Sequence, residues 1–460
     1  MKSSLFAAIT GALCIGLSPV AFAENTTSPD AVILPTVKMP MIDFVEYDLP
    51  NGLHVILHQN KTAPVVSTYL LYHVGSKNER PDRTGFAHFF EHLMFEGSEN
   101  IKRGEIFKYA SAAGGDVNAS TSFDRTDYHF NMPANQLGLA LWIESERMLH
   151  GKVEKVGVET QRQVVKEERR LRTENAPYGT LYENLAGMVF KGTPYEWPPI
   201  GAVQYIDKAT LDEFRSFYHQ YYIPNNATLV VAGDFDLDAT KKLIADYFGP
   251  IPRGNKIKRP EFALQPQQAP TEKTVALANT PLPAVLHAWR APAETSADAP
   301  ALELLADILA TGRSSRLYER LVRGDQTASE IEAFPMLLEK GGAVGVFAVG
   351  NPQTPLEKLD AAVVEEIAKV RDAGVTPEEL QKAKNLKMRE LAQAYGTMLS
   401  RAQNLAHYHV MFGDTGKINQ QWEKYEKVTA NDIQRVAAKY LIPQGDNVLH
   451  YPVVKPNASK

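Results

Sequence analysis

The sequence predicts an α+β protein made of two homologous domains, each a mixed, largely antiparallel sheet packed with helices. Two observations lead to this prediction. Strand-like and helical segments alternate along the 460 residues, and a segment that closes the first half recurs at the end of the second. With 44% hydrophobic and 22% charged residues, the chain is long and apolar enough to bury two cores.

The first residues of the chain are typical of a secretory signal peptide. Lys2 precedes an apolar run that extends to about Val20, and Ala21 and Ala23 suit a cleavage site after residue 23. An uncleaved anchor is the alternative, but the run is short for a membrane span, and no later segment is apolar enough to be one. We therefore expect residues 1–23 to be removed and the mature protein to be periplasmic, without an integral membrane span.

The only cysteine, Cys14, lies within this predicted signal. The mature chain would therefore contain no thiol, which excludes disulfide bonds and thiolate metal ligands, so any zinc ion must be held by histidine and carboxylate. Loss of Lys2 makes the formal charge one unit more negative than the −5 of the whole chain. This acidic balance does not indicate nucleic acid as a partner.

A sequence repeat defines the two domains. Residues 208–231 (KATLDEFRSFYHQYYIPNNATLVV) and 427–450 (KVTANDIQRVAAKYLIPQGDNVLH) share Lys, Thr, Tyr, Ile and Pro at a single offset of 219 positions, without a gap. In the two copies, Thr210 and Thr429 can each cap a helix that ends at Ile-Pro before an apolar strand. Two unrelated capped helices are the alternative, but the identical spacing favours a duplication.

The other elements follow from periodicity, in chain order. Apolar or alternating runs predict strands, and Thr376-Pro377 followed by Glu379 predicts a capped helix. The predicted strands are 54–59, 65–74, 227–233, 284–289 and 342–350, and the predicted helices include 137–149 and 377–395. The segment 249–273 is rich in Pro, Gly and Lys, as linkers are. We expect an N-terminal extension (24–42), a first domain (43–250), a linker (251–272, with the boundary near Lys258) and a second domain (273–460).

Residues 85–97, GFAHFFEHLMFEG, contain the strongest functional signal. On a helix, His88 and His92 lie one above the other, so their imidazoles can converge on one metal ion. Glu91 points about 100° away, so it cannot be an equivalent third ligand and can instead reach a metal-bound water. The plainer alternative is a helical histidine pair that binds backbone or water. Histidine nitrogen and carboxylate oxygen suit zinc, and a catalytic zinc site uses three protein ligands.

The repeat argues that these polar residues are specific to the first half. When Gly97 is aligned with Gly312, FAHFFEHLMFEG lies over ALELLADILATG. The apolar scaffold is kept, whereas the three polar residues are replaced by Glu303, Ala306 and Asp307. A helix that needed His88, Glu91 and His92 for folding would be expected to keep them in both copies.

The inverted His-x-x-Glu-His order is the inverzincin motif. Residues 74–100, VGSKNERPDRTGFAHFFEHLMFEGSEN, resemble the signature of the pitrilysin family of zinc peptidases, and in particular its shorter bacterial members similar to the mitochondrial processing peptidase β subunit. The resemblance extends over essentially the whole mature chain, including the duplication. It implies that 43–250 is the catalytic zinc-binding domain, that 273–460 is an inactive homologous domain, and that the chain forms half of a clamshell.

The resemblance also implies a third zinc ligand. In the family this is a glutamate on a later helix, and the family pattern laid on residues 161–168 ends at Glu168, 76 residues after His92. The neighbouring Glu167 is a competitor, and most of 166–172 could also be a solvated charged face. Gln161 stands where the family often has a glutamate. It can keep a hydrogen bond to the site, but not the charge.

Residues 114–133 predict two strands around a turn at 123–125, because apolar and polar residues alternate there. The resemblance implies that the first of these strands is a sheet edge to which an extended peptide adds, with Asn118 and Ala119 binding the substrate backbone. An ordinary hairpin, in which Asn118 starts the turn or caps a neighbouring element, is the alternative.

The family completes its site with an arginine and a tyrosine seven residues apart, which stabilise the oxyanion. Arg323 fits the arginine, but the residue seven positions later is Glu330, and Tyr318 lies on the wrong side. The resemblance therefore implies a heterodimer with a similar subunit that supplies Arg and Tyr, with a homodimer as the second choice.

We therefore predict an exported zinc metalloendopeptidase that hydrolyses extended or unfolded peptides, with Glu91 as general base. A non-hydrolytic peptide-binding or assembly subunit is the main alternative, and a structural zinc protein is a third. His407 and His409 are two apart and face different sides of a helix, so they do not indicate a second metal site. His54, His58 and His73 are expected in strands.

Overall fold

The structure, a computed structural model, describes residues 41–454, which belong to the compact unit Met41–Lys460. The predicted signal peptide 1–23 and nearly all of the extension 24–42 lie outside these residues. Within the described part of the chain, no helix combines the length and the apolar character needed to cross a bilayer.

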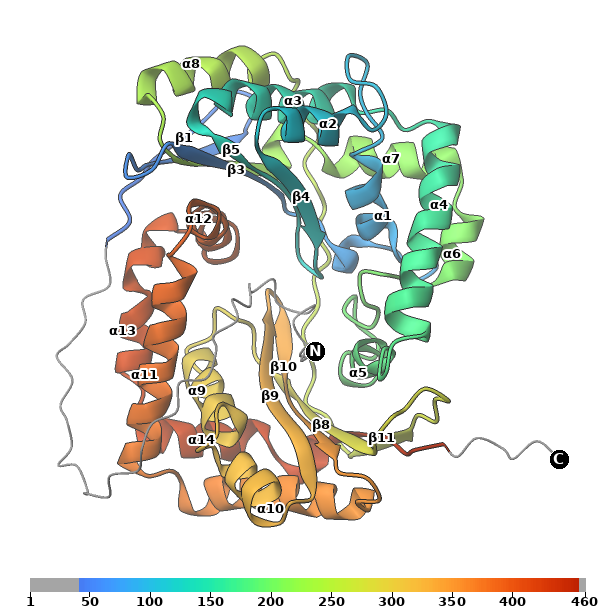
Figure 1. Cartoon of the computed structure of the whole chain (residues 1–460), viewed down its shortest axis with the longest axis vertical. Helices are drawn as coiled ribbons and strands as arrows, with labels where there is room; N and C mark the ends of the chain where they lie inside the picture. Colours follow the sequence, from blue (N-terminus) through green and yellow to red (C-terminus); the bar gives the residue numbers. More distant parts are fainter. Residues whose placement is uncertain (1–40, 455–460) are drawn as a thin grey trace. The chain divides into compact units, whose positions relative to one another are not determined.

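The first half contains a six-stranded sheet in the order β1-β2-β6-β3-β5-β4 (Figure 1). All neighbouring strands run antiparallel except β2 and β6, which are parallel. The strands are β1 (Val45–Asp48), β2 (His54–Gln59), β3 (Val65–Tyr72), β4 (Asp116–Thr121), β5 (Thr126–Pro133) and β6 (Ala227–Gly233). The helices are α1 (Phe86–Leu93), α2 (Glu105–Ala112), α3 (Leu137–His150), α4 (Lys155–Arg169), α5 (Leu181–Val189), α6 (Val203–Lys208), α7 (Leu211–Tyr221) and α8 (Leu237–Phe248).

The second half contains a five-stranded sheet in the order β7-β11-β8-β10-β9. Here β7 and β11 are parallel, and the other neighbours are antiparallel. The strands are β7 (Thr271–Thr274), β8 (Ala284–Ala291), β9 (Ala328–Leu338), β10 (Gly341–Gly350) and β11 (Asn447–Tyr451). The helices are α9 (Ala299–Ala310), α10 (Leu356–Ala373), α11 (Pro377–Ala394), α12 (Met398–Phe412), α13 (Gln421–Glu426) and α14 (Ala430–Tyr440).

The two sheets have the same topology, which confirms the α+β fold and the duplication. The order β2-β6-β3-β5-β4 in the first half matches β7-β11-β8-β10-β9 in the second, including the single parallel pair. The helices α7 and α14 begin with capping boxes made by Thr210 with Glu213 and by Thr429 with Asp432. In both copies a short 3₁₀ turn at Ile-Pro then leads into a strand, β6 or β11.

The elements predicted from periodicity are present. Five of the predicted strands correspond to β2, β3, β6, β8 and β10, and the two predicted around the turn at 123–125 correspond to β4 and β5. The predicted helices 137–149 and 377–395 correspond to α3 and α11. The strand β7 begins at Thr271, inside the segment 251–272 that the sequence analysis assigned to the linker, because it pairs with the distant strand β11. Two π-helical turns, η3 (Arg170–Glu174) and η5 (Tyr318–Gly324), have no counterpart in the predictions.

Each half has a hydrophobic core of its own between its sheet and its helices. In the first half α1 contacts β4, β5, α4 and α7, so this short helix lies where the core meets the edge strand β4. The helix α12 of the second half lies against β2, β3 and β6 of the first-half sheet (Figure 1). The polar residues of α1, which are His88, Glu91 and His92, therefore lie close to β4 and α4.

Candidate active site

The helix α1 is held at its beginning by the buried side chain of Glu79. It starts after Gly85, which has a φ of 95° and therefore suits glycine. The Glu79 side chain accepts hydrogen bonds from the backbone N–H groups of Gly85 (2.9 Å) and Ala87 (2.8 Å), as a capping residue would. The aromatic rings of Phe86 and Phe89 stack on Phe214 of α7. These contacts anchor the apolar side of the helix and leave its other side free to face α4.

The helix α4 is anchored by its own buried stripe. Val158 and Val165 are buried seven residues apart, and the Arg162 guanidinium donates to the carbonyl oxygen of Ala209 at 3.0 Å. Gln161 and Glu168 are also seven residues apart, and both contact His92 of α1. Two turns of α4 thus present two polar side chains to the histidine pair, which agrees with the same-face spacing in the sequence.

The structure brings His88, His92 and Glu168 together. The two Nε2 atoms are 3.3 Å apart, and the Glu168 Oε2 lies 3.2 Å from the Nε2 of His92 and 3.5 Å from that of His88. Ligands about 2.0–2.1 Å from a tetrahedral zinc ion are separated by about 3.3 Å from one another. The three atoms therefore have the mutual spacing that three ligands of a four-coordinate zinc ion require.

A hydrogen-bonded chain behind His92 orients its imidazole. The Nδ1 of His92 lies 3.2 Å from the Oε1 of Gln161, and the Nε2 of Gln161 donates to the Glu96 carboxylate at 2.5 Å. Because a carboxylate only accepts, the Gln161 amide must turn its nitrogen to Glu96 and its oxygen to His92. The Nδ1 of His92 then carries a proton, so Nε2 is the nitrogen that can bind a metal ion once it has lost its own proton.

Charge in the cluster is distributed as a cation site needs. Burial lowers the pKa of His88 to about 4, and repulsion from His92 adds to this effect. Burial would raise the pKa of Glu168, but the hydrogen bond that the Nε2 of His92 donates when it is protonated, together with nearby positive charges such as that of Arg172, outweighs burial and holds that pKa at about 2. Near neutral pH the site therefore offers a neutral imidazole from His88 and a carboxylate from Glu168.

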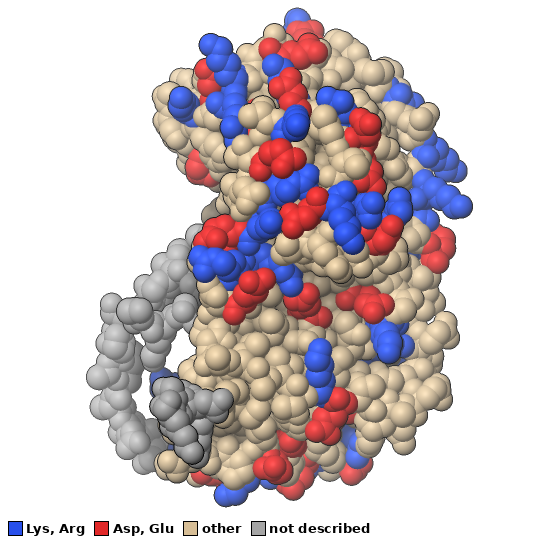
Figure 2. Space-filling view, turned by 90° about the vertical axis from the view of Figure 1, so that its right-hand side faces the viewer, with Lys and Arg blue, Asp and Glu red and all other residues tan. Residues whose placement is uncertain are grey.

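The two adjacent glutamates of α4 point in different directions. Glu168 places one oxygen toward the histidines and the other 2.7 Å from the guanidinium of Arg172. Glu167 is exposed and pairs with Arg170 at 2.5 Å. Lys166 pairs with Asp207 of α6 at 3.1 Å. Figure 2 shows the side of the molecule where α4 and α6 lie in Figure 1, with acidic and basic side chains interspersed. Apart from Glu168, the charged side chains here therefore agree with the alternative given in the sequence analysis, a solvated charged helix face over most of residues 166–172.

Glu91 is held by the edge strand. The hydroxyl of Thr121, the last residue of β4, donates to the Glu91 Oε2 at 2.6 Å. Burial raises the pKa of Glu91, and this hydrogen bond opposes the rise. Glu91 also interacts electrostatically with His92 and Glu168. The acid of the motif is therefore beside the ligand cluster and directly linked to the end of β4.

The strand β4 is the outer strand of its sheet, beyond β5. Asn118 is exposed in the middle of this strand, and its side-chain oxygen accepts a hydrogen bond from the N–H of Ala119 at 2.9 Å. That N–H is therefore directed toward the open edge. The family resemblance implied that Asn118 and Ala119 lie on an edge strand, and β4 is one, with Thr121, the hydrogen-bond partner of Glu91, as its last residue.

The second half has a different arrangement at the equivalent position. Lys387 of α11 follows Glu168 by 219 positions, the same offset as the repeat. Its buried ammonium lies 3.2 Å from the Glu303 carboxylate of α9 and 2.8 Å from that of Glu390. Attraction to Glu303, Glu390 and Asp307 outweighs burial and raises the pKa of Lys387. Where the first half has two histidines and a carboxylate, the second half has carboxylates around a lysine.

The residues considered for oxyanion stabilisation lie in η5 and β9. Arg323 is exposed in η5 and pairs with Glu319 at 3.2 Å, and Glu330 is in β9. Tyr318 also belongs to η5 and is half-buried. The residue seven positions after Arg323 is Glu330 rather than a tyrosine. A partner subunit that supplies an Arg and Tyr pair therefore stays a prediction.

Sequence reasoning missed Thr121, Glu96, Glu79 and Arg172. Each acts on the cluster or on α1 through hydrogen bonds or an ion pair. Only Arg172 had a local signal, because it follows Glu168 by four residues on a helix. The other contacts join segments whose pairing depends on the tertiary fold.

Comparison with known proteins agrees with this geometry. Residues 54–201 match the family described as Insulinase (Peptidase family M16), and residues 208–387 match the one described as Peptidase M16 inactive domain. The zinc protease PqqE of Helicobacter pylori is 32% identical over 396 residues, which cover 85% of this chain and 89% of that protein. An uncharacterized zinc protease of Bacillus subtilis, YmxG, is 24% identical over 74% of this chain and 81% of its own length.

Solved structures show the same fold. A crystal structure of a protease from Helicobacter pylori matches with a TM-score of 0.85 and 29% identity, over 91% of this chain and all of that chain. The periplasmic protease PqqL of Escherichia coli matches with a TM-score of 0.75 and 20% identity, over 91% of this chain and 48% of that chain. From the two matching domains and the relatives that share most of its length, the chain belongs to peptidase family M16.

Proposed function

We propose that this protein is an exported zinc metalloendopeptidase that hydrolyses peptide bonds in extended or unfolded peptides. The observation that carries the proposal is the mutual spacing of 3.2–3.5 Å among the Nε2 atoms of His88 and His92 and the Oε2 of Glu168, beside the carboxylate of Glu91. Relatives named zinc proteases support it. Export is supported by the predicted signal and by the description of the distant relative PqqL as periplasmic.

The donor set fits zinc rather than a harder cation. Two imidazole nitrogens and one carboxylate oxygen form a three-ligand set that leaves a fourth position open, as in catalytic zinc sites. Calcium and magnesium prefer oxygen ligands alone. A bound zinc ion lowers the pKa of water and polarises a carbonyl group. His88, His92 and Glu168 would hold the ion, and Gln161 fixes the tautomer of His92 in which Nε2 is free.

Glu91 would act as the general base. It accepts the proton of the attacking water and later passes it to the leaving amine, so one carboxylate acts in both steps. Burial favours its protonated form, and the hydrogen bond from Thr121 stabilises the ionised form that accepts a proton. The edge of β4 would align the peptide backbone beside Glu91, since added strands pair through main-chain groups with little dependence on side chains.

The test is metal analysis together with digestion of a quenched peptide by the full chain, with candidate partner subunits present. We expect zinc in the purified protein, loss of activity on chelation and recovery with Zn²⁺. Glu91→Gln should retain the zinc and lose turnover. A chain that binds zinc but never cleaves, in any partner combination, would favour the alternative of a non-hydrolytic peptide-binding subunit. Activity that survives complete metal removal would contradict the proposal.

A further inference from the structure

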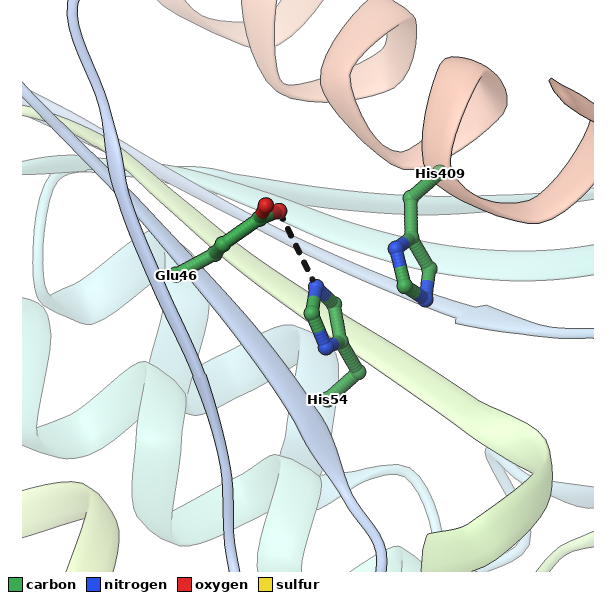
Figure 3. Close-up of side chains that lie close together, drawn as sticks. All are labelled: Glu46, His54 and His409. Carbon is green, nitrogen blue, oxygen red and sulfur yellow. Dashed lines mark hydrogen bonds and ion pairs between the residues drawn. The ribbon is translucent and has the colours of Figure 1, made fainter. Parts of the chain in front are cut away.

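A second group of possible metal ligands lies where α12 meets the first-half sheet. Glu46 comes from β1, His54 from β2 and His409 from α12, and one ligand atom of each lies within 4.8 Å of the others (Figure 3). In Figure 3 the Glu46 carboxylate and the His409 ring both lie beside the His54 ring, and a dashed line joins Glu46 to His54. The donor set, two imidazoles and one carboxylate, is chemically the same as that of His88, His92 and Glu168.

The His54 imidazole is oriented by a carboxylate on each side. Its Nδ1 lies 2.8 Å from the Oδ1 of Asp48, the residue opposite it in the β1–β2 ladder, and its Nε2 lies 3.3 Å from the Oε2 of Glu46. When Asp48 accepts the Nδ1 proton, Nε2 presents its lone pair toward Glu46. Metal-binding histidines commonly donate a hydrogen bond to a carboxylate from the ring nitrogen that does not bind the metal.

The Glu46 carboxylate is also oriented by a hydrogen bond from the second half. The buried hydroxyl of Thr415, just after α12, donates to its Oε2 at 2.6 Å. Among residues 41–454, Glu46 and Asp48 form ion pairs with His54 only, and no lysine or arginine neutralises them. The cluster therefore carries negative charge without a fixed cation, which favours binding of a positive ion.

His409 supplies the second imidazole of the group. Its ring stacks on that of His54, with centroids 3.5 Å apart and planes 5° from parallel. The lone pairs of two parallel rings run side by side, so a shared ion requires the half-buried His409 ring to turn about its side-chain bonds.

We propose that Glu46, His54 and His409 form a second, non-catalytic site for a first-row divalent cation such as Zn²⁺, which fastens α12 to β1 and β2. The mixture of imidazole nitrogen and carboxylate oxygen selects zinc and its neighbours over Ca²⁺ and Mg²⁺. The ion joins segments that are more than 350 residues apart in the chain. It therefore stabilises the contact between the two halves and takes no part in hydrolysis.

The experiment separates this site from the catalytic one. In full-length protein carrying His88→Ala and His92→Ala, zinc or Co²⁺ binding is measured by equilibrium dialysis with elemental analysis. We expect one remaining metal ion per chain and a rise in melting temperature on metal addition. His409→Ala and His54→Ala in this background should each abolish both effects. Asp48→Asn keeps all three donor atoms and should weaken binding about 10- to 100-fold.

The matched control is His407→Ala. His407 is two residues from His409 on the same helix, but it pairs with Glu294 at 2.7 Å and lies outside the cluster. This variant should keep the remaining metal ion and the metal-dependent rise in melting temperature. Circular dichroism confirms that each variant is folded. The proposal is overturned if the background protein binds no metal ion, or if His409→Ala binds as much as His407→Ala. Because activity is not measured, these outcomes do not depend on the proposed peptidase function.

Discussion

At the scale of single residues, the direction of a side chain decides which of two adjacent carboxylates can hold the metal. Glu168 faces the histidines and Glu167 faces Arg170, although both are on α4. We expect Glu168→Gln to lose most of its zinc, because the amide keeps the shape but not the charge. Glu167→Gln, the matched control, should keep wild-type zinc content by elemental analysis. The opposite pattern would mean that the third ligand is Glu167.

A second residue-scale prediction concerns Thr121. The substitution Thr121→Val conserves shape and removes the hydroxyl that donates to Glu91 at 2.6 Å. A hydrogen bond to a charged group contributes about 1.5–3 kcal/mol, so a tenfold or greater fall in kcat/KM is expected when Glu91 loses its orientation. Zinc content should not change, because Thr121 contacts no proposed ligand. A variant with unaltered kinetics on several peptides would show that Glu91 is positioned without Thr121.

The sequence could predict those residues of the candidate site that lie close together in the chain. The spacing of His88 and His92 identified a pair on one helix face, because helical geometry alone brings them together. Glu168 is on another helix, and only the family resemblance pointed to it. Thr121 and Glu96 could not be found in this way, because their contacts require β4 and the segment after α1 to be folded against α1 and α4.

At the scale of elements, β4 offers a specific test of peptide addition to the sheet edge. The N–H of Ala119 donates to the Asn118 side chain at the open edge, so Ala119→Pro removes a group that an added peptide strand would use. Proline is tolerated on an edge strand when its N–H would face solvent. We expect a higher KM for peptides, with zinc content unchanged. Asn118→Ala should also weaken turnover.

Equal KM values for wild type and Ala119→Pro across several peptides would remove β4 as the docking edge. Circular dichroism and melting temperature serve as the control for folding. Both predictions for β4 concern substrate binding and are independent of which residues hold the metal.

A buried histidine in the second half makes stability depend on pH. His287 of β8 has its Nδ1 2.9 Å from Asp446 and its Nε2 3.0 Å from Asp360. Burial opposes its charge, but the two carboxylates outweigh this and raise its pKa from 6.5 to about 9. The folded state thus holds the proton more tightly than the unfolded state. The resulting stabilisation, up to about 3 kcal/mol, is complete below pH 6.5 and disappears as the pH rises through 9.

The measurement is melting temperature against pH for wild type and His287→Gln. The difference between the two proteins should be largest near pH 6 and should shrink toward pH 9. The exposed His219 provides the control, since His219→Gln should follow the wild-type curve. Parallel curves for wild type and His287→Gln would contradict the predicted linkage.

Most elements were predictable because their signals are local. The capping boxes at Thr210, Thr376 and Thr429 begin helices as predicted, and apolar runs became the central strands. The edge strands β1 and β7 were not predicted, since each has four residues, mostly exposed, and gains its structure by pairing with a neighbour. The π-helical turns were not predicted either, because their sequences carry ordinary helical periodicity.

At the scale of the whole molecule, the chain has Glu330, not a tyrosine, seven residues after Arg323. We therefore expect the isolated chain to be a poor peptidase and a paralogous subunit carrying Arg and Tyr to increase its rate. Loss of one oxyanion donor typically costs about 10²- to 10³-fold, while zinc occupancy should be normal. Peptide hydrolysis is measured with and without the candidate partner. Rapid hydrolysis by the homogeneous chain, unaffected by the partner, would favour a homodimer or a monomer.

The lysine at the centre of the second half has a consequence for how the protein depends on metal supply. Lys387 places a positive charge among Glu303, Asp307 and Glu390, and this charge belongs to a side chain of the protein itself. The equivalent place in the first half would obtain its positive charge from a diffusible ion. During metal starvation the second domain would therefore keep its internal charge balance, whereas the first domain would lose its own. Scarcity of zinc would then act on one half of a duplicated fold and leave the other half intact.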